Sequence, residues 1–263
     1  MSNNSTHKMF PKFPNGNVGT HITLTCPPSI NLKDICHLTQ HLIVDNSSII
    51  THTVLSELLD TCPNLTNLAC WGDIIPHLVW PSISKLTHLR RLSLANTEQH
   101  PGDSDFLSAH LLSAPFSSHL THLELELVNP SEDSHSHSAC QWDPSFLISL
   151  PSLTHLTIYF SYANPAFDYK RLGNVLAQCP NLRVFILCSP AQDPDTPEDV
   201  YDLYATEHRM VLVDNSLCDF THWVRCARGG NGSDAWAYAE QVVMMRKGSW
   251  FSFFAFMPLL VFC

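Results

Sequence analysis

Charged residues, and basic residues above all, are scarce in this chain of 263 residues. Only 14% of the residues are Asp, Glu, Lys or Arg, and 14 Lys and Arg stand against 24 Asp and Glu, which gives a formal net charge of -10 at pH 7. An electrostatic field of this sign repels phosphate backbones. We therefore do not expect a nucleic acid as a partner.

The sequence also lacks the motifs of common catalytic and nucleotide-binding sites. It contains no G-x-S-x-G elbow, no Walker A sequence and no dinucleotide-binding glycine pattern. The glycine-rich stretch at 228–232 is not followed by the Lys-Ser/Thr of a phosphate loop, and it is typical of a turn that caps a helix. These absences predict a protein that is not an enzyme and uses no cofactor.

A secretory signal and a long hydrophobic run are likewise missing. The polar start, MSNNSTHKMFPKFPNG, has no basic residue followed by an apolar stretch. The apolar tail at 249–263 has 15 residues and includes Pro258, whereas a membrane-spanning helix needs roughly 17 to 25. We expect no membrane partner and interpret the tail as a gene-model artefact such as translated intron, with a tail anchor or a packed edge segment as alternatives.

Ten cysteines are present, but their positions do not suggest a disulfide framework. Cys62 and Cys179 recur inside the same phrase, CPNL, while Cys70 and Cys188 lie in or beside expected strands. Free cysteine behaves there as a small buried hydrophobe, and a chain of this size does not need disulfides for stability. We expect reduced thiols and a location in the cytoplasm or nucleus.

What the sequence does contain is a short leucine pattern that recurs five times. Apolar residues follow the L-x-x-L-x-L arrangement of leucine-rich repeats in LTNLAC (65–70), LRRLSL (89–94), LTHLEL (120–125), LTHLTI (153–158) and LRVFIL (182–187). The first leucines are 24 to 33 residues apart, which fits a strand plus a helix in each repeat. Segments 54–65, 105–116 and 171–182 carry apolar residues at the spacing of a helix that buries one stripe.

The expected fold is an α/β leucine-rich repeat solenoid, a horseshoe or arc with parallel strands on its concave face and helices outside. An earlier, degenerate repeat is expected at 37–45 and a cap strand at 21–25. After the repeats, a strand at 209–213 and a helix within 227–248 are predicted. We divide the chain into an N-terminal polar segment and cap (1–34), the repeats (35–190), a C-terminal cap (191–248) and the hydrophobic tail (249–263).

Strand alternation places one row of side chains on the inner surface of this arc. The leucines face the core, so the residues that flank the second and third leucines face outward. Trp, Tyr and Arg dominate binding energy at interfaces, and acidic side chains favour a protein partner with a basic segment. The predicted partner-binding residues are Trp71, Arg91, Ser93, His122, Glu124, Glu126, His155, Thr157 and Tyr159.

Longer phrases surround and follow the repeats: CPNLTNLACWG (62–72), LTHLRRLSL (86–94), LPSLTHLTI (150–158), RMVLVD (209–214) and W-x-x-x-A-R-G-G-x-x-x-x-A-W-A-x-A-E (223–240). Over about residues 35 to 248 the chain resembles the leucine-rich domain of fungal F-box-like proteins. The resemblance implies that 209–247 closes the repeat array and that the protein is the substrate-recognition part of a ubiquitin-ligase adaptor. Residues 1–31 show no F-box, the element that docks on the Skp1 adaptor, so the residues support only the recognition role.

Two other interpretations remain open. The loop SHSHSAC contains His135, His137 and Cys140, which are zinc-ligand types, but no second pair at the spacing of a zinc site accompanies them. A metal-binding or hydrolytic protein that uses this loop is one alternative, although we predict no metal site. A truncated gene product without a selected function is the other.

Overall fold

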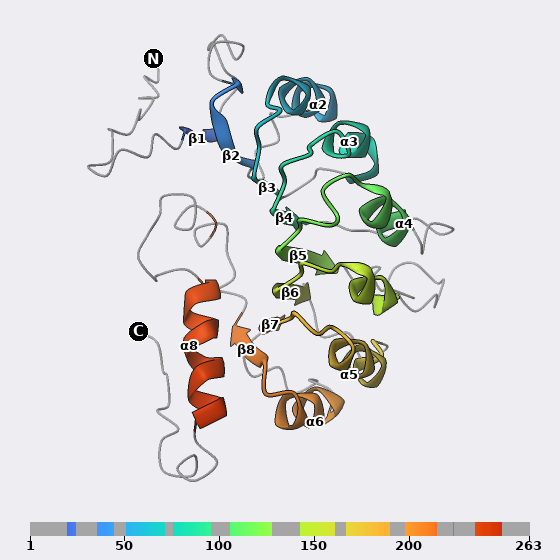
Figure 1. The fold of residues 1–263 in the computed structure, drawn as a ribbon, viewed down its shortest axis with the longest axis vertical. Helices are drawn as coiled ribbons and strands as arrows, with labels where there is room; N and C mark the ends of the chain where they lie inside the picture. The colour runs from blue at the N-terminus through green and yellow to red at the C-terminus, as the bar shows by residue number, and fades with distance from the viewer. Residues whose placement is uncertain are drawn as a thin grey trace, which may run out of the picture.

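The computed structural model describes residues 20–24, 36–44, 51–71, 76–95, 106–127, 143–160, 167–189, 198–214, 223 and 235–248. Within them, eight strands form one sheet in which every neighbouring pair is parallel. The strands are β1 (Thr20–Leu24), β2 (Thr39–Val44), β3 (Asn67–Cys70), β4 (Arg91–Leu94), β5 (His122–Leu127), β6 (His155–Phe160), β7 (Val184–Ser189) and β8 (Met210–Asp214). Their order in the sheet is their order in the chain. Figure 1 shows that the strands follow an arc.

Helices lie on the outer side of this arc, between successive strands (Figure 1). They are α2 (His52–Thr61), α3 (Pro76–Ile83), α4 (Phe106–Ser113), the 3-10 helix η1 (Pro144–Ser149), α5 (Tyr169–Ala177) and α6 (Glu198–Thr206). The prediction of an α/β fold with parallel strands and alternating helices is confirmed. The helices expected at 54–65, 105–116 and 171–182 are present as α2, α4 and α5, and the strands expected at 21–25 and 209–213 are β1 and β8. The segment 37–45, where a degenerate repeat is expected, contains β2.

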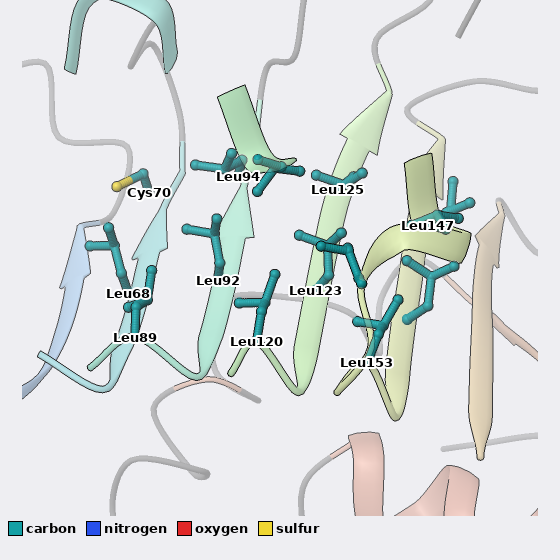
Figure 2. Close-up of a cluster of buried hydrophobic side chains, with 14 of the residues drawn as sticks. Leu68, Cys70, Leu89, Leu92, Leu94, Leu120, Leu123, Leu125, Leu147 and Leu153 are labelled. Atoms are coloured by element: carbon teal, nitrogen blue, oxygen red, sulfur yellow. The ribbon is translucent and has the colours of Figure 1, made fainter. Parts of the chain in front are cut away.

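The leucines of the repeated pattern form the core between the sheet and the outer helices. Equivalent residues stand side by side in the sheet, because Leu68 pairs with Leu92, Leu92 with Leu123, and Leu123 with Leu156. Each of these four side chains is 0% exposed, and Figure 2 shows Leu68, Leu92 and Leu123 side by side. Burying a leucine side chain stabilises a fold by roughly 1.5–3 kcal/mol. One continuous apolar cluster therefore holds the successive turns together.

Polar side chains add cross-links between turns at the edge where the strands begin. The hydroxyl groups of three threonines donate to a carbonyl of the preceding turn, Thr66 to Gln40 (3.1 Å), Thr121 to Arg90 (3.0 Å) and Thr154 to Thr121 (3.0 Å). Side chains just before the first leucine of a repeat do the same, namely Asn64 to His37 (2.7 Å), Ser152 to Ser118 (2.6 Å) and Asn181 to Pro151 (2.7 Å). The recurring Leu-Thr and Pro-Asn/Ser-Leu phrases thus fix the spacing of the turns through hydrogen bonds.

Several predictions concern segments outside the described residues. They include the tail at 249–263 and the three zinc-ligand types His135, His137 and Cys140. In the part of the chain that the structure describes, no helix is both long and apolar enough to cross a membrane. The division of the chain into four parts stays a prediction.

Candidate functional site

The nine predicted partner-binding residues share one face of the sheet, opposite the leucine core, which we call the inner face. Strand pairing aligns them in the rows Arg91–His122–His155, Ser93–Glu124–Thr157 and Glu126–Tyr159. Trp71 directly follows β3, and its indole Nε1 donates to Ser93 Oγ at 2.7 Å. Strand alternation and strand pairing therefore bring the nine residues together on one face, as expected.

The inner face is not free, and here the sequence-based expectation is wrong. Ser93, Glu124 and Thr157 are only 1%, 3% and 2% exposed. His122 and His155 are also buried, and the remaining four residues, Trp71, Arg91, Glu126 and Tyr159, are half-buried. A partner cannot reach the buried residues while this cover is in place. Their role in partner binding stays a prediction.

Two parts of the chain that follow the repeats provide the cover. Trp223 packs over β2 and β3, and helix α8 (Ala235–Gly248) packs over β7 and β8. Figure 1 shows α8 on the opposite side of the sheet from α5 and α6. The resemblance implies that 209–247 closes the end of the array. β8 does extend the sheet there, whereas α8 lies along the inner face.

A chain of buried hydrogen bonds holds Trp223 in place. Ser93 Oγ accepts from Trp71 and donates to Glu124 Oε1 at 3.2 Å. The other carboxylate oxygen, Oε2, accepts from Nε1–H of Trp223 at 3.0 Å. Trp223 itself is 2% exposed. Because both oxygens of Glu124 have donors inside the protein, this carboxylate serves to seat Trp223 and does not face solvent.

Two stacked imidazoles form the contact between the sheet and α8. The rings of His122 and His155 have centroids 4.1 Å apart and an interplanar angle of 2°. Trp236 of α8 meets both rings edge-on, at 5.3 and 5.4 Å. Glu240 lies four residues further along the same helix, and its Oε1 is 3.1 Å from His155 Nε2. Residues four apart share one face of a helix, so Trp236 and Glu240 together connect α8 to side chains of β5 and β6.

Burial keeps both imidazoles neutral. Burial, assisted by the positive charge of Arg91 and by the neighbouring imidazole of His155, lowers the pKa of His122 to about 2. Burial also lowers the pKa of His155, although the carboxylate of Glu240 opposes that shift. Neutral His155 therefore donates from Nε2–H to Glu240, and its Nδ1 lies 2.8 Å from the hydroxyl oxygen of Thr154. At neutral pH this contact is a hydrogen bond to a carboxylate, not an ion pair.

Apolar packing and one arginine fix the rest of α8. Trp236, Ala239 and Val243 are buried against the inner-face side chains of β7 and β8. Near the end of the helix, the Arg246 guanidinium lies 4.1 Å from the centroid of the Tyr204 ring. It also donates to three backbone carbonyls between residues 204 and 210. The N-terminal part of α8 is therefore attached to the sheet, and its C-terminal part is attached to residues 204–210 at the last turn of the arc.

Cys188 departs from the expectation that all thiols are reduced. It lies on the inner face of β7, fully buried, and it is disulfide-bonded. The other described cysteines, Cys36, Cys62, Cys70 and Cys179, are free and buried, as expected. The prediction of reduced thiols is thus confirmed for these four residues and wrong for Cys188. Within the described ranges, no group of three or more His, Cys, Asp or Glu could hold a metal ion.

Trp223, Trp236 and Glu240 contact the inner face, a role that strand alternation does not predict. All three belong to the pattern at 223–240 on which the resemblance to F-box-like proteins partly depends. The pattern singles out these residues but does not show on which face of the sheet the helix lies. The position of these residues over the inner face depends on their contacts with His155 and Glu124, which are remote in sequence.

Comparisons with known proteins identify no family for this chain. No protein-family model matches it, and none of the curated proteins shows significant similarity to it.

Proposed function

We propose that the chain is a leucine-rich repeat module that recognises another protein through its inner face and the adjoining side of α8. The observation that carries this proposal is the single parallel sheet whose strands follow chain order, with equivalent leucines in register. In such an array each turn contacts only its neighbours, so the fold presents a long continuous surface. A surface of this kind suits a macromolecule better than a small substrate.

The contact residues of this proposal are those that Trp223 and α8 leave partly open. They are Trp71, Arg91, Glu126 and Tyr159, all half-buried on the inner face. Helix α8 adds Met244 and Met245, which are 65% and 58% exposed. Aromatic and arginine side chains contribute most to binding when an interface buries them, and methionine adapts to varied partner shapes.

The resemblance to F-box-like proteins supports a narrower form of the proposal. In this form the module selects substrates for a ubiquitin ligase in the cytoplasm or nucleus. It requires a Skp1-type adaptor to join the complex, directly or through a second protein. No enzyme activity, cofactor or nucleic acid is part of the proposal.

Affinity purification from the source cells, followed by mass spectrometry, tests the recognition role. The inner-face variant Arg91→Ala with Glu126→Ala should lose at least about ten-fold of a specifically captured partner, because each interface contact of this kind contributes on the order of 1 kcal/mol. The matched control is Lys170→Ala with Asp202→Ala, on the exposed sides of the outer helices α5 and α6. Equal capture by the wild-type chain and the inner-face variant would show that the surface is the wrong one.

The ligase link has a separate test in the same experiment. Recovery of a Skp1-type adaptor with the wild-type chain supports it. If a specific partner is captured without any such adaptor, the recognition role stands and the ligase role is refuted.

A further inference from the structure

An open groove lined mostly by polar residues follows the edge of the sheet at which the strands begin. It has a volume of about 860 Å³ and crosses four successive turns, from the start of β2 to the start of β5. Its lining includes Gln40, Asn64, Thr66, His88, Arg90 and His119. None of the residues that the proposed function uses is among them, so this is a second surface.

Two rows of side chains form the groove, and the repeat explains both. The residues of one row come directly before the first buried residue of each repeat, and those of the other row come directly after it. In one repeat, His88 comes before Leu89 and Arg90 comes after it. Leu89 is 0% exposed, so the alternation of the extended chain directs its two neighbours outward. The backbone at Arg90 is held on both sides, because its N–H donates to Thr66 O (2.7 Å) and its carbonyl accepts from Thr121 N (2.8 Å).

The charge of the groove is opposite to that of the protein as a whole. The chain has a formal net charge of -10, yet no Asp or Glu lines the groove, and Arg90 does. Four other basic side chains in the described residues are paired with carboxylates, namely Lys85, Lys170, Arg171 and Arg209. Among the same residues, the side chains of Arg90, His88 and His119 have no hydrogen-bond or ion-pair partner. They are donors available to an acidic ligand.

The dimensions favour a peptide over a single ion. Neighbouring strands are about 4.8 Å apart, so the three intervals between four turns measure roughly 14 Å. An extended chain advances about 3.3 Å per residue, so four or five residues cover that distance. A lone anion would occupy only a small part of a groove of about 860 Å³.

We propose that this groove binds a short, extended acidic segment of a partner protein, with a carboxylate on Arg90 and further carboxylates near His88 and His119. The proposal rests on the recognition function and specifies the chemistry of one partner segment. An acidic partner segment differs from the basic segment that the acidic inner-face residues led us to expect. Glu124, one of those residues, is buried under Trp223 and cannot contact a partner. Acidic peptides should avoid the rest of this acidic protein, so binding at the groove would be selective.

Fluorescence anisotropy with the full chain tests the proposal. The probes are a labelled peptide of six glutamates and its six-glutamine counterpart, measured in 0.05 and 0.15 M salt. The glutamate peptide should bind, more weakly at the higher salt, and the glutamine peptide should not. The variant Arg90→Gln should weaken binding about five-fold, which is the effect expected for one exposed charged contact.

Arg183→Gln is the matched control. Arg183 follows the first leucine of a later repeat just as Arg90 does, is also exposed, and has the same backbone bond, from its N–H to Thr154 O (2.8 Å). It does not line the groove. Arg183→Gln should bind the peptide within about two-fold of wild type.

Three results would overturn the proposal. They are equal affinity of Arg90→Gln and wild type, an equal loss in Arg183→Gln, or displacement of the glutamate peptide by the same concentration of inorganic phosphate. The last would show a site for a single anion. The two proposals can fail separately. If capture of a partner depends on Arg91 and Glu126 but the glutamate peptide does not bind, the groove proposal is refuted and the recognition function of the inner face stands.

Discussion

Acidification should weaken the fold through His122, the buried imidazole against which Trp236 packs. In the folded protein the pKa of His122 is about 2, chiefly because of burial, whereas an unfolded histidine titrates near 6.5. The folded pKa is lowered, so the stability that depends on the neutral ring is present above pH 6.5. It is lost as the pH falls below that value, because only the unfolded chain then takes up a proton at this position. Between pH 7 and pH 5 the free energy of unfolding should fall by about 2 kcal/mol from this group.

Urea unfolding followed by tryptophan fluorescence at pH 7, 6 and 5 measures this effect. The variant His122→Gln removes the titrating group, so its free energy of unfolding should fall by about 2 kcal/mol less than that of wild type over the interval. His119→Gln is the control, since it removes a histidine whose ring is exposed, three residues earlier on the same turn. Comparison of slopes cancels the contribution of the other histidines, which all the proteins share.

The same experiment can refute the reasoning. If wild type and His122→Gln lose stability equally between pH 7 and pH 5, His122 takes up its proton without cost in the folded state, and its burial under α8 is not maintained in solution. If His119→Gln changes the pH dependence of the free energy of unfolding as much as His122→Gln does, that dependence reflects the number of histidines and not the burial of His122.

Three further predictions test the cover of the inner face. Thr157 Oγ1 is buried without a hydrogen-bond partner in the described part of the chain, so Thr157→Val should raise the free energy of unfolding by about 1 kcal/mol in urea; a loss would indicate a partner for this hydroxyl. Glu124→Gln leaves one acceptor oxygen for two donors, the Ser93 hydroxyl and Trp223 Nε1–H, so it should destabilise by about 1–3 kcal/mol and be non-additive with Trp223→Phe, which removes one of those donors; additive losses would argue against this hydrogen-bond network. Peptide mapping without reductant should recover Cys188 in a cross-linked peptide, and a free, alkylated Cys188 would contradict the disulfide.

The arc and its leucine core could be predicted from the sequence because one physical demand repeats. Each of the five repeats buries the apolar residues at its second and third leucine positions, such as Leu92 and Leu94, against the outer helices, and the next strand must align its own apolar residues beside them. A pattern that recurs at this spacing leaves few other ways to bury the same side chains. The strands, their order and the inner-face residues follow from it.

Helix α3 shows where that reasoning fails. Its segment contains Pro76 and Pro81, which argue against a helix when propensity alone is considered. Pro76 occupies the first helical position, where no backbone hydrogen bond is lost. Val79, Trp80 and Ile83 then bury a stripe against the core. Tertiary packing thus outweighs the unfavourable proline in the middle of this helix.

The cover of the inner face follows the chemistry of the residues beneath it, and this is the part that sequence alternation alone could not supply. At the far end of the array, Val184, Ile186 and Val211 make the inner face apolar, and strands that are apolar on both faces require a second layer. α8 supplies that layer with Trp236, Ala239 and Val243. In the middle of the array the inner face carries Glu124, and the residue that covers it is a tryptophan whose N–H satisfies the carboxylate. An apolar helix face thus covers the apolar strands, and a hydrogen-bond donor covers the carboxylate. The composition of the inner face therefore predicts the chemistry of the residues that cover it, while only the fold shows which segment provides them.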